Sequence, residues 1–124
     1  VVGFPQALAI SNDELLTIPC DVLIPAALEN QISEDNVNQV QAKFVAEAAN
    51  GPVTLEASQA LEARGVTVLP DILTNAGGVV VSYLEWVQGL SYLFWDEERV
   101  NREMENLMVQ AYKQVIHHSQ KRQM

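Results

Sequence analysis

Three short segments rich in apolar residues, each followed within four residues by a proline, stand out in the hydrophobic pattern of the chain. They lie at residues 21–24, 43–48 and 66–69, and the last run is mostly β-branched. Short continuous runs of this kind are typical of strands in a parallel sheet, where helices cover both faces. The pattern therefore predicts three strands, with residues 66–69 forming a buried one.

Polar residues that favour helix starts precede the segments between these runs. Ser11 precedes a helical turn at residues 14–17, and Thr54 precedes a helix that ends near residue 64, with Gly65 as its C-cap glycine. Residues 33–41 predict a short helix or a turn-rich crossover. In the helix after Thr54, four residues are expected to face inward: Leu55, Ala57, Ala60 and Leu61.

A long helix is predicted from residue 75 or 76 to about residue 88, with Asn75 as its N-cap and Gly89 just after its end. Gly77 and Gly78 each lower helix propensity by roughly 1 kcal/mol relative to alanine. We therefore expect them to allow close approach of the backbone to a ligand or to a neighbouring element at the helix N-terminus.

A last helix is predicted over residues 96–117, with Asp96 as its cap, and residues 117–124 are expected to fray. An apolar stripe with spacings of three and four runs along it: Val100, Met104, Leu107, Ala111 and Val115. His117 and His118 point about 100° apart on a helix, so they cannot share one metal ion. No metal site is predicted.

The order strand, crossover, strand, helix, strand, helix, helix predicts an α/β fold with a parallel sheet and right-handed crossovers. Three strands make half of a doubly wound, three-layer, Rossmann-like sheet. Because no G-x-G-x-x-G phosphate loop occurs, this half is expected to be the second mononucleotide half, followed by C-terminal helices. Its core should span about residues 20–90.

Composition narrows the possible partners. The 124 residues are 48% hydrophobic and 19% charged, enough for a core, and the net charge of −9 disfavours nucleic acids and anionic membranes. Cys20 is the only cysteine, and a buried thiol is expected there. With no apolar run of about 18 residues and no targeting motif, a reducing, cytoplasmic setting is expected.

Small or amide side chains follow each predicted strand. Ligands of open parallel sheets bind beyond the carboxyl ends of the strands, so these exits mark the expected working edge. Ala26 and Ala27 follow the first strand, Asn50 and Gly51 the second, and Asn75 the third. Each asparagine has a plainer interpretation, since Asn-Gly is a turn pair and Asn75 can be a helix cap.

Val79 and Ser82 are spaced from Asn75 by four and then three residues, so the three should share one stripe of the long helix. A serine in an apolar helical run can also bond the carbonyl four residues earlier, which leaves a structural interpretation of Ser82 open. Glu47 and Glu85 have no spacing that pairs them, and both are assigned structural roles.

Three segments resemble the glutamate dehydrogenases of the amino-acid dehydrogenase family. They are PDILTNAGGVVVSYLEW at residues 70–86, CDVLIPAALEN at residues 20–30 and KFVAEAANGP at residues 43–52. The resemblance runs over most of residues 1–112. It implies a C-terminal fragment, residues 1–124, of an NAD(P)-binding domain. A substrate domain and the first half of the nucleotide-binding domain would then be absent from this chain.

The resemblance implies an oxidoreductase that interconverts L-glutamate and 2-oxoglutarate plus ammonia with NAD or NADP. Ala26, Ala27 and Gly51 would line the cofactor, and Asn50 and Asn75 would contact its nicotinamide ribose and nicotinamide end. Ser82 would meet the side-chain carboxylate of the substrate, and Val79 its carbon chain. The leucine, phenylalanine and valine dehydrogenases carry an apolar residue at the position of Ser82, so a hydroxyl there favours an acidic substrate.

No catalytic residue is assigned, because the family's catalytic lysine and aspartate belong to the substrate domain. The isolated chain is expected to be inactive, and the family suggests a hexameric parent. A half-sheet leaves a strand edge unpaired and apolar helix faces uncovered, so the isolated chain is expected to self-associate. The alternatives are a non-enzymatic nucleotide-binding or assembly module, or a dehydrogenase for another amino acid.

Overall fold

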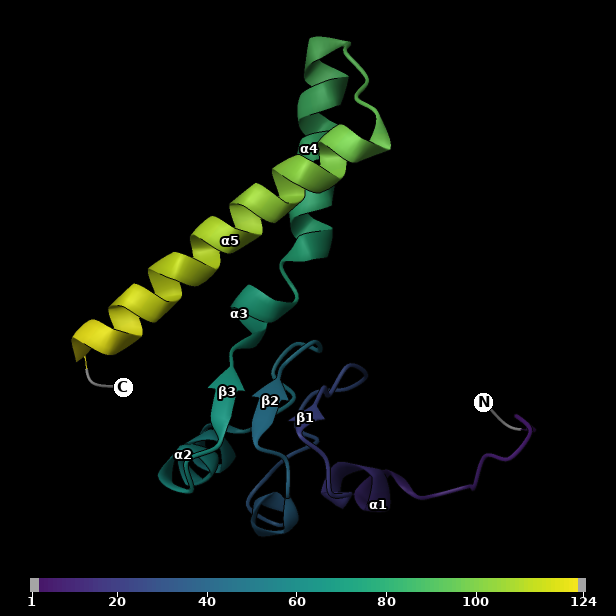
Figure 1. The fold of residues 1–124 in the computed structure, drawn as a ribbon, viewed down its shortest axis with the longest axis vertical. Helices are drawn as coiled ribbons and strands as arrows, with labels where there is room; N and C mark the ends of the chain where they lie inside the picture. The colour runs from purple at the N-terminus through teal and green to yellow at the C-terminus, as the bar shows by residue number, and fades with distance from the viewer. Residues whose placement is uncertain (1–2, 123–124) are drawn as a thin grey trace. The chain divides into compact units, whose positions relative to one another are not determined.

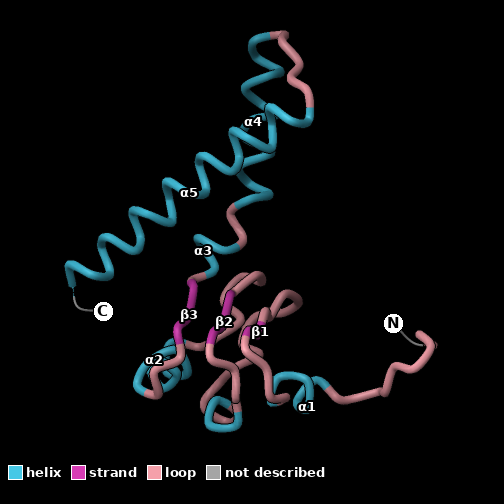
Figure 2. Tube along the Cα trace, viewed as in Figure 1, coloured by secondary structure: helices cyan, strands magenta, loops and turns pink. Residues whose placement is uncertain are grey.

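The computed structural model describes residues 3–122, which divide into two compact units with the boundary between Asp71 and Ile72 (Figure 1). The first unit holds a sheet of three strands, β1 (Val22–Leu23), β2 (Phe44–Ala46) and β3 (Thr67–Leu69), in the order β1-β2-β3 (Figure 2). Both pairings are parallel, with Val22 opposite Phe44 and Val45 opposite Val68. The expected α/β fold with a parallel sheet is confirmed, although each strand is shorter than its apolar run.

The helix starts of the first unit follow the expected caps. Helix α1 (Asn12–Thr17) begins with a capping box between Ser11 and Glu14. Helix α2 (Leu55–Ala63) begins with the Thr54 hydroxyl accepting the Ala57 N–H, and Gly65 follows its end with a left-handed φ of 77°. Between β1 and β2 lies one 3₁₀ turn, η1 (Val37–Gln39).

The core of the first unit packs α2 and the crossover segments against the middle strand. Its largest fully buried side chains are Ile32, Val40, Val45, Pro52 and Leu61. The expectation that Leu55 faces inward is wrong, because its side chain is 70% exposed. Leu55 lies about 200° around the helix from the buried Ala57, whereas Leu61, four residues after Ala57, returns to the buried side.

The outer strands are less buried than their composition suggests. Val66 is buried, Thr67 is exposed, and Val68 and Leu69 are half-buried, so the expected burial of residues 66–69 is confirmed only at Val66. Val22 in β1 is exposed. In a sheet of three strands only β2 has neighbours on both sides, and Val45 at its centre is fully buried. Cys20 is half-buried against the core rather than fully buried.

The segment after β3 differs from the expected loop and long helix. It forms one helical turn, α3 (Asp71–Thr74), and then α4 (Gly77–Ser91). The N-cap of α4 is Ala76, without a side-chain cap hydrogen bond, so the expectation that Asn75 is the cap is wrong. Gly89 lies inside α4, which ends at Tyr92 with a left-handed φ of 53°. The Gln88 side chain accepts the N–H of Trp95 at 2.6 Å and closes the turn after the helix.

The last helix, α5 (Glu97–Arg122), packs against α4 in the second unit. The Asp96 carboxylate accepts the Arg99 N–H at 2.8 Å, as expected of its cap. Most of the expected apolar stripe is half-buried, except Leu107, which is exposed. The helix continues past residue 117, where fraying was expected. None of the helices in residues 3–122 combines the length and apolar character needed to cross a membrane.

Candidate functional site

The carboxyl ends of the three strands meet at one edge of the sheet in the first unit, as their parallel directions require (Figure 1). The Pro25 carbonyl, after β1, accepts the N–H groups of Ala48 and Ala49 at 3.1 and 2.9 Å. The Glu47 N–H, after β2, donates to the Leu69 carbonyl of β3 at 3.1 Å. Backbone hydrogen bonds therefore join all three exits, which we call the exit edge (residues 24–27, 47–52 and 69–71).

The expected cofactor residues of the first unit lie exposed on this edge: Ala26, Ala27, Asn50 and Gly51. Gly51 has a left-handed φ of 53°, which a glycine adopts without strain. Its N–H donates to the Asp71 carboxylate at 2.8 Å and its carbonyl accepts the Asn30 N–H at 2.8 Å. Since both backbone groups are engaged, Gly51 offers a ligand mainly the bare surface of its Cα.

Glu47 is the buried ionisable group of the exit edge, with 8% of its surface exposed. Its carboxylate accepts the Asp71 N–H at 2.9 Å, and it forms no ion pair with any residue in the part of the chain described. Burial raises the pKa of the Glu47 carboxyl above its ordinary value of 4.5, and the Asp71 carboxylate adds to the rise, while the backbone N–H groups of Asp71 and Val53 oppose it.

Replacing Glu47 with glutamine is expected to make the stability of the chain less dependent on pH. Below 4.5 the Glu47 carboxyl is protonated in the folded and the unfolded chain, and its contribution to stability is fully present. As the pH rises through the raised pKa, the unfolded chain loses this proton more readily, so that contribution is lost. The free energy of unfolding of the wild type should therefore fall relative to that of Glu47→Gln between pH 4 and pH 7.

Urea denaturation followed by far-ultraviolet circular dichroism measures this difference at the two pH values. The control is Glu62→Gln, which neutralises an exposed carboxylate on α2. An offset between Glu47→Gln and the wild type that is the same at pH 4 and pH 7 would show that Glu47 titrates like a solvated carboxyl.

In the second unit, α4 presents two different faces. Leu84 is 5% exposed on the side packed against α5, while Val79 is 73% exposed, and Ser82 is exposed as well. Val79 and Ser82 share one side of the helix, as expected from their spacing. Asn75 lies before the N-cap, so the expectation that it continues this helical stripe is wrong.

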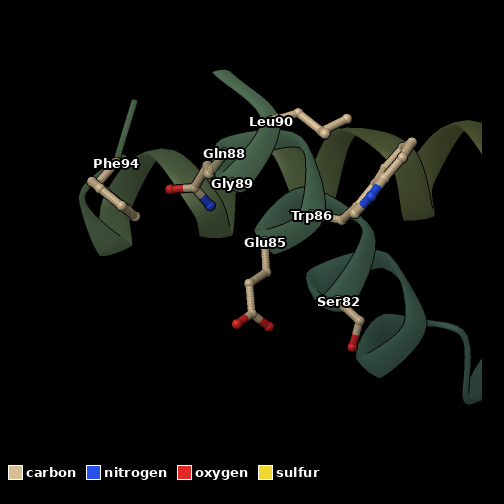
Figure 3. A pocket seen from close by; sticks show the side chains of 7 residues that line it. All are labelled: Ser82, Glu85, Trp86, Gln88, Gly89, Leu90 and Phe94. Carbon is tan, nitrogen blue, oxygen red and sulfur yellow. The ribbon is translucent and has the colours of Figure 1, made fainter. Parts of the chain in front are cut away.

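The Ser82 hydroxyl forms no hydrogen bond with the residues that the structure describes. By contrast, the Ser91 hydroxyl near the end of the same helix donates to the Val87 carbonyl at 2.9 Å. The structural interpretation of Ser82, a bond to the carbonyl four residues earlier, is therefore wrong. Ser82 lies at an open hollow of about 550 Å³, where its side chain and that of Glu85 extend to the same side (Figure 3). The remaining lining residues are Trp86, Gln88, Gly89, Leu90 and Phe94.

The two glycines at the start of α4 are not required by packing among the described residues. A Cβ placed on Gly77 would meet only the Met104 sulfur, at an ordinary 3.9 Å, and one placed on Gly78 would meet nothing within 4 Å. Packing in the second unit therefore does not explain why the first turn of α4 has two residues without side chains.

The sequence profile of the Glutamate/Leucine/Phenylalanine/Valine dehydrogenase family matches residues 2–124. The chain belongs to this family. It is 49% identical over 106 residues to the cryptic catabolic NAD-specific glutamate dehydrogenase GudB of Bacillus subtilis, covering 86% of this chain and 25% of that protein. It is also 49% identical over 116 residues to the glutamate dehydrogenase of Thermotoga maritima, covering 94% of this chain and 28% of that protein.

Among solved structures, the hetero-hexameric glutamate dehydrogenase of Thermus thermophilus in its Leu-bound form matches with a TM-score of 0.90. The identity is 34%, over 97% of this chain and 29% of that one. The chain thus spans about a quarter of the length of these members of the dehydrogenase family. The comparison agrees with an α/β fold built on a three-stranded parallel sheet.

The structure groups the expected site residues of this dehydrogenase-family chain into two sets. Ala26, Ala27, Asn50 and Gly51 come together at the exit edge of the first unit, and Val79 and Ser82 on one face of α4 in the second. The sequence analysis did not assign Glu47 and Asp71 of the exit edge to a site, although both form hydrogen bonds there. A signal for Glu47 existed, because strand alternation places it on the same side as the buried Val45.

Proposed function

We propose that this chain is part of an NAD(P)-dependent glutamate dehydrogenase, which interconverts L-glutamate and 2-oxoglutarate plus ammonia. In this proposal the chain supplies the nicotinamide end of the cofactor site and one wall of the substrate pocket. Membership of the dehydrogenase family supports the reaction class. The names of two relatives, which specify glutamate as substrate, support the choice of amino acid.

The exit edge fits a nicotinamide dinucleotide. Its exposed residues are small or carry an amide, so a planar, polar ligand can lie against the backbone at Ala26, Ala27 and Gly51. Asn50 and Asn75 would offer carboxamide groups to the nicotinamide ribose and the nicotinamide. The bound cofactor would accept the hydride from the α-carbon of the amino acid. NAD and NADP both remain candidates, while the name of the Bacillus subtilis relative specifies NAD.

The single observation that carries the choice of glutamate is the Ser82 hydroxyl. It is exposed, it forms no hydrogen bond with a described residue, and it stands in an apolar helical run beside Val79. A hydroxyl placed to meet a carboxylate oxygen discriminates against substrates that leave it unpaired. In an enzyme for leucine or valine, an apolar residue would suit this position better.

We also propose that the parent enzyme is a homo-oligomer; the Thermus thermophilus structure is of a hetero-hexamer. Large apolar side chains exposed on the second unit support association with further protein. They include Val79, Trp86, Leu90, Leu93 and Phe94. Self-association of the isolated chain stays a prediction.

The test is a substrate survey of the full-length enzyme that contains this chain. We expect turnover with L-glutamate and at least one of NAD and NADP, and a kcat/KM for leucine, valine and phenylalanine that is much lower. The isolated 124-residue chain should reduce neither cofactor above the blank. If the full-length enzyme preferred an apolar amino acid, the proposal that glutamate is its substrate would be overturned. Absence of any turnover would favour a nucleotide-binding or assembly module.

A further inference from the structure

The loop after β2, residues 47–53, is held by several of its backbone groups. Ala48 and Ala49 donate to the Pro25 carbonyl, and Gly51 donates to the Asp71 carboxylate. On the acceptor side, the Gly51 carbonyl takes the N–H of Asn30, and the Pro52 carbonyl takes those of Gln31 and Ile32, at 2.8–2.9 Å. A surface loop needs far fewer internal bonds than this, since water satisfies exposed backbone groups.

Glu47 ties the base of this loop to the start of α3. It stands at the first position of the loop, and its buried carboxylate accepts the Asp71 N–H at 2.9 Å. A buried carboxylate without a cationic partner costs free energy, and the bond from this backbone N–H recovers part of that cost.

Asp71 completes the connection from the other side. Its N–H is given to Glu47 and its carboxylate oxygen takes the Gly51 N–H at 2.8 Å. The two acidic residues therefore hold both the base and the tip of the loop, on either side of Asn50. Asn50 itself is exposed at the tip, where Gly51 turns the chain with a left-handed φ.

We propose that Glu47 and Asp71 are positioning residues that hold the 47–53 loop, and with it the Asn50 carboxamide, in place for the nicotinamide cofactor. This inference rests on the proposed function of the exit edge. Neither carboxylate needs to touch the cofactor. They hold the Asn50 carboxamide, which is the group proposed to contact the cofactor. A contact residue that is already held by surrounding hydrogen bonds loses less conformational entropy when the ligand binds.

The positions of these two groups predict a particular kinetic signature. A loop that is released should bind the cofactor less tightly and orient it less well, so kcat/KM for the cofactor should fall about 10- to 100-fold. A purely structural role would instead lower the fraction of folded enzyme, which reduces kcat and leaves the KM for the cofactor unchanged. The split between KM and kcat therefore separates the two roles.

The experiment compares matched variants of the full-length enzyme. Asp71→Ala removes the acceptor of the Gly51 N–H, while Asp71→Asn keeps an oxygen there and should restore most of the loss. Glu47→Ala removes the acceptor of the Asp71 N–H, while Glu47→Gln keeps an oxygen there and should restore most of the loss. The control Glu62→Gln changes an exposed carboxylate on α2 that has no bond to the loop and should leave the kinetics unchanged.

The expected result is a raised KM for the cofactor in Asp71→Ala and Glu47→Ala, near wild-type values in Asp71→Asn and Glu47→Gln, and a melting temperature shifted by only a few degrees. If Glu47→Ala does not fold, Asp71→Ala with its partner Asp71→Asn still decides the matter. Asn50→Ala is measured beside them. A raised KM in Asn50→Ala with wild-type KM in Asp71→Ala would overturn the positioning role but leave the proposed function standing. An unchanged KM in Asn50→Ala would overturn the cofactor role of Asn50 and the positioning role with it, while turnover of glutamate would still support the proposed reaction.

Discussion

Replacing Ser82 with valine in the full-length enzyme is expected to lower kcat/KM for glutamate about 10- to 150-fold. A hydrogen bond to a charged group contributes roughly 1.5–3 kcal/mol. Losing that free energy in the transition state corresponds to a fall in kcat/KM of about 10- to 150-fold. The Ser82 hydroxyl is exposed and forms no hydrogen bond with a described residue, so nothing within α4 competes for it. Activity with leucine or valine should be retained or increased, because an apolar residue at this position no longer leaves a polar group unpaired.

Ser82→Thr is the matched control. Threonine and valine have nearly the same shape and the same branching at Cβ, so their difference isolates the hydroxyl from the effect of added bulk on a helix. Steady-state kinetics with glutamate, leucine and valine should place Ser82→Thr much closer to the wild type than Ser82→Val. Equal glutamate kinetics in the threonine and valine variants would remove Ser82 from the substrate pocket.

Replacing Leu61 with alanine is expected to destabilise the first unit by about 2–5 kcal/mol. Leu61 is fully buried on α2, and it belongs to the same core as Ile32, Val40 and Val45. Truncation removes its transfer free energy and leaves a cavity between α2 and the sheet. A loss of this size is a large fraction of the total stability of a typical domain, so the first unit should open far more often.

Leu55→Ala provides the comparison, since it removes the same atoms from the same helix at a side chain that is 70% exposed. It should change stability by less than about 0.5 kcal/mol. Hydrogen exchange of the β2 amides is the suitable probe, because Trp86 and Trp95 both lie in the second unit and their fluorescence does not report on the first. Similar exchange rates in the two variants would show that Leu61 does not anchor the core.

The features best predicted from the sequence are those decided by neighbouring residues. The caps at Ser11, Thr54 and Asp96 were all correct, since each side chain bonds a backbone group three residues away. Their identity and spacing contain the whole interaction. The strand exits were also placed correctly, because parallel strands must end at the same edge.

The features that the sequence misjudged depend on contacts that local patterns do not contain. Gly89 was taken for the end of a helix, but α4 runs on through it, since a glycine inside a helix costs only about 1 kcal/mol. The helix ends at Ser91 instead, and in the turn after it the Trp95 N–H donates to the Gln88 side chain. Leu55 was misplaced because composition alone does not state which side of α2 meets the core.

By itself, the sequence determined the order of strands and helices, the positions of most caps, the parallel sheet and membership of the dehydrogenase family. The spacing of hydrophobic residues and the helix caps depend on residues only a few positions apart, and family motifs depend on residue identity alone. All of them can therefore be recognised in the sequence. Only the tertiary structure decided that Glu47 is buried and joined to Asp71, and that Asp71 holds Gly51. Burial and hydrogen bonds between residues 20 or more positions apart depend on where the folded chain brings those segments together.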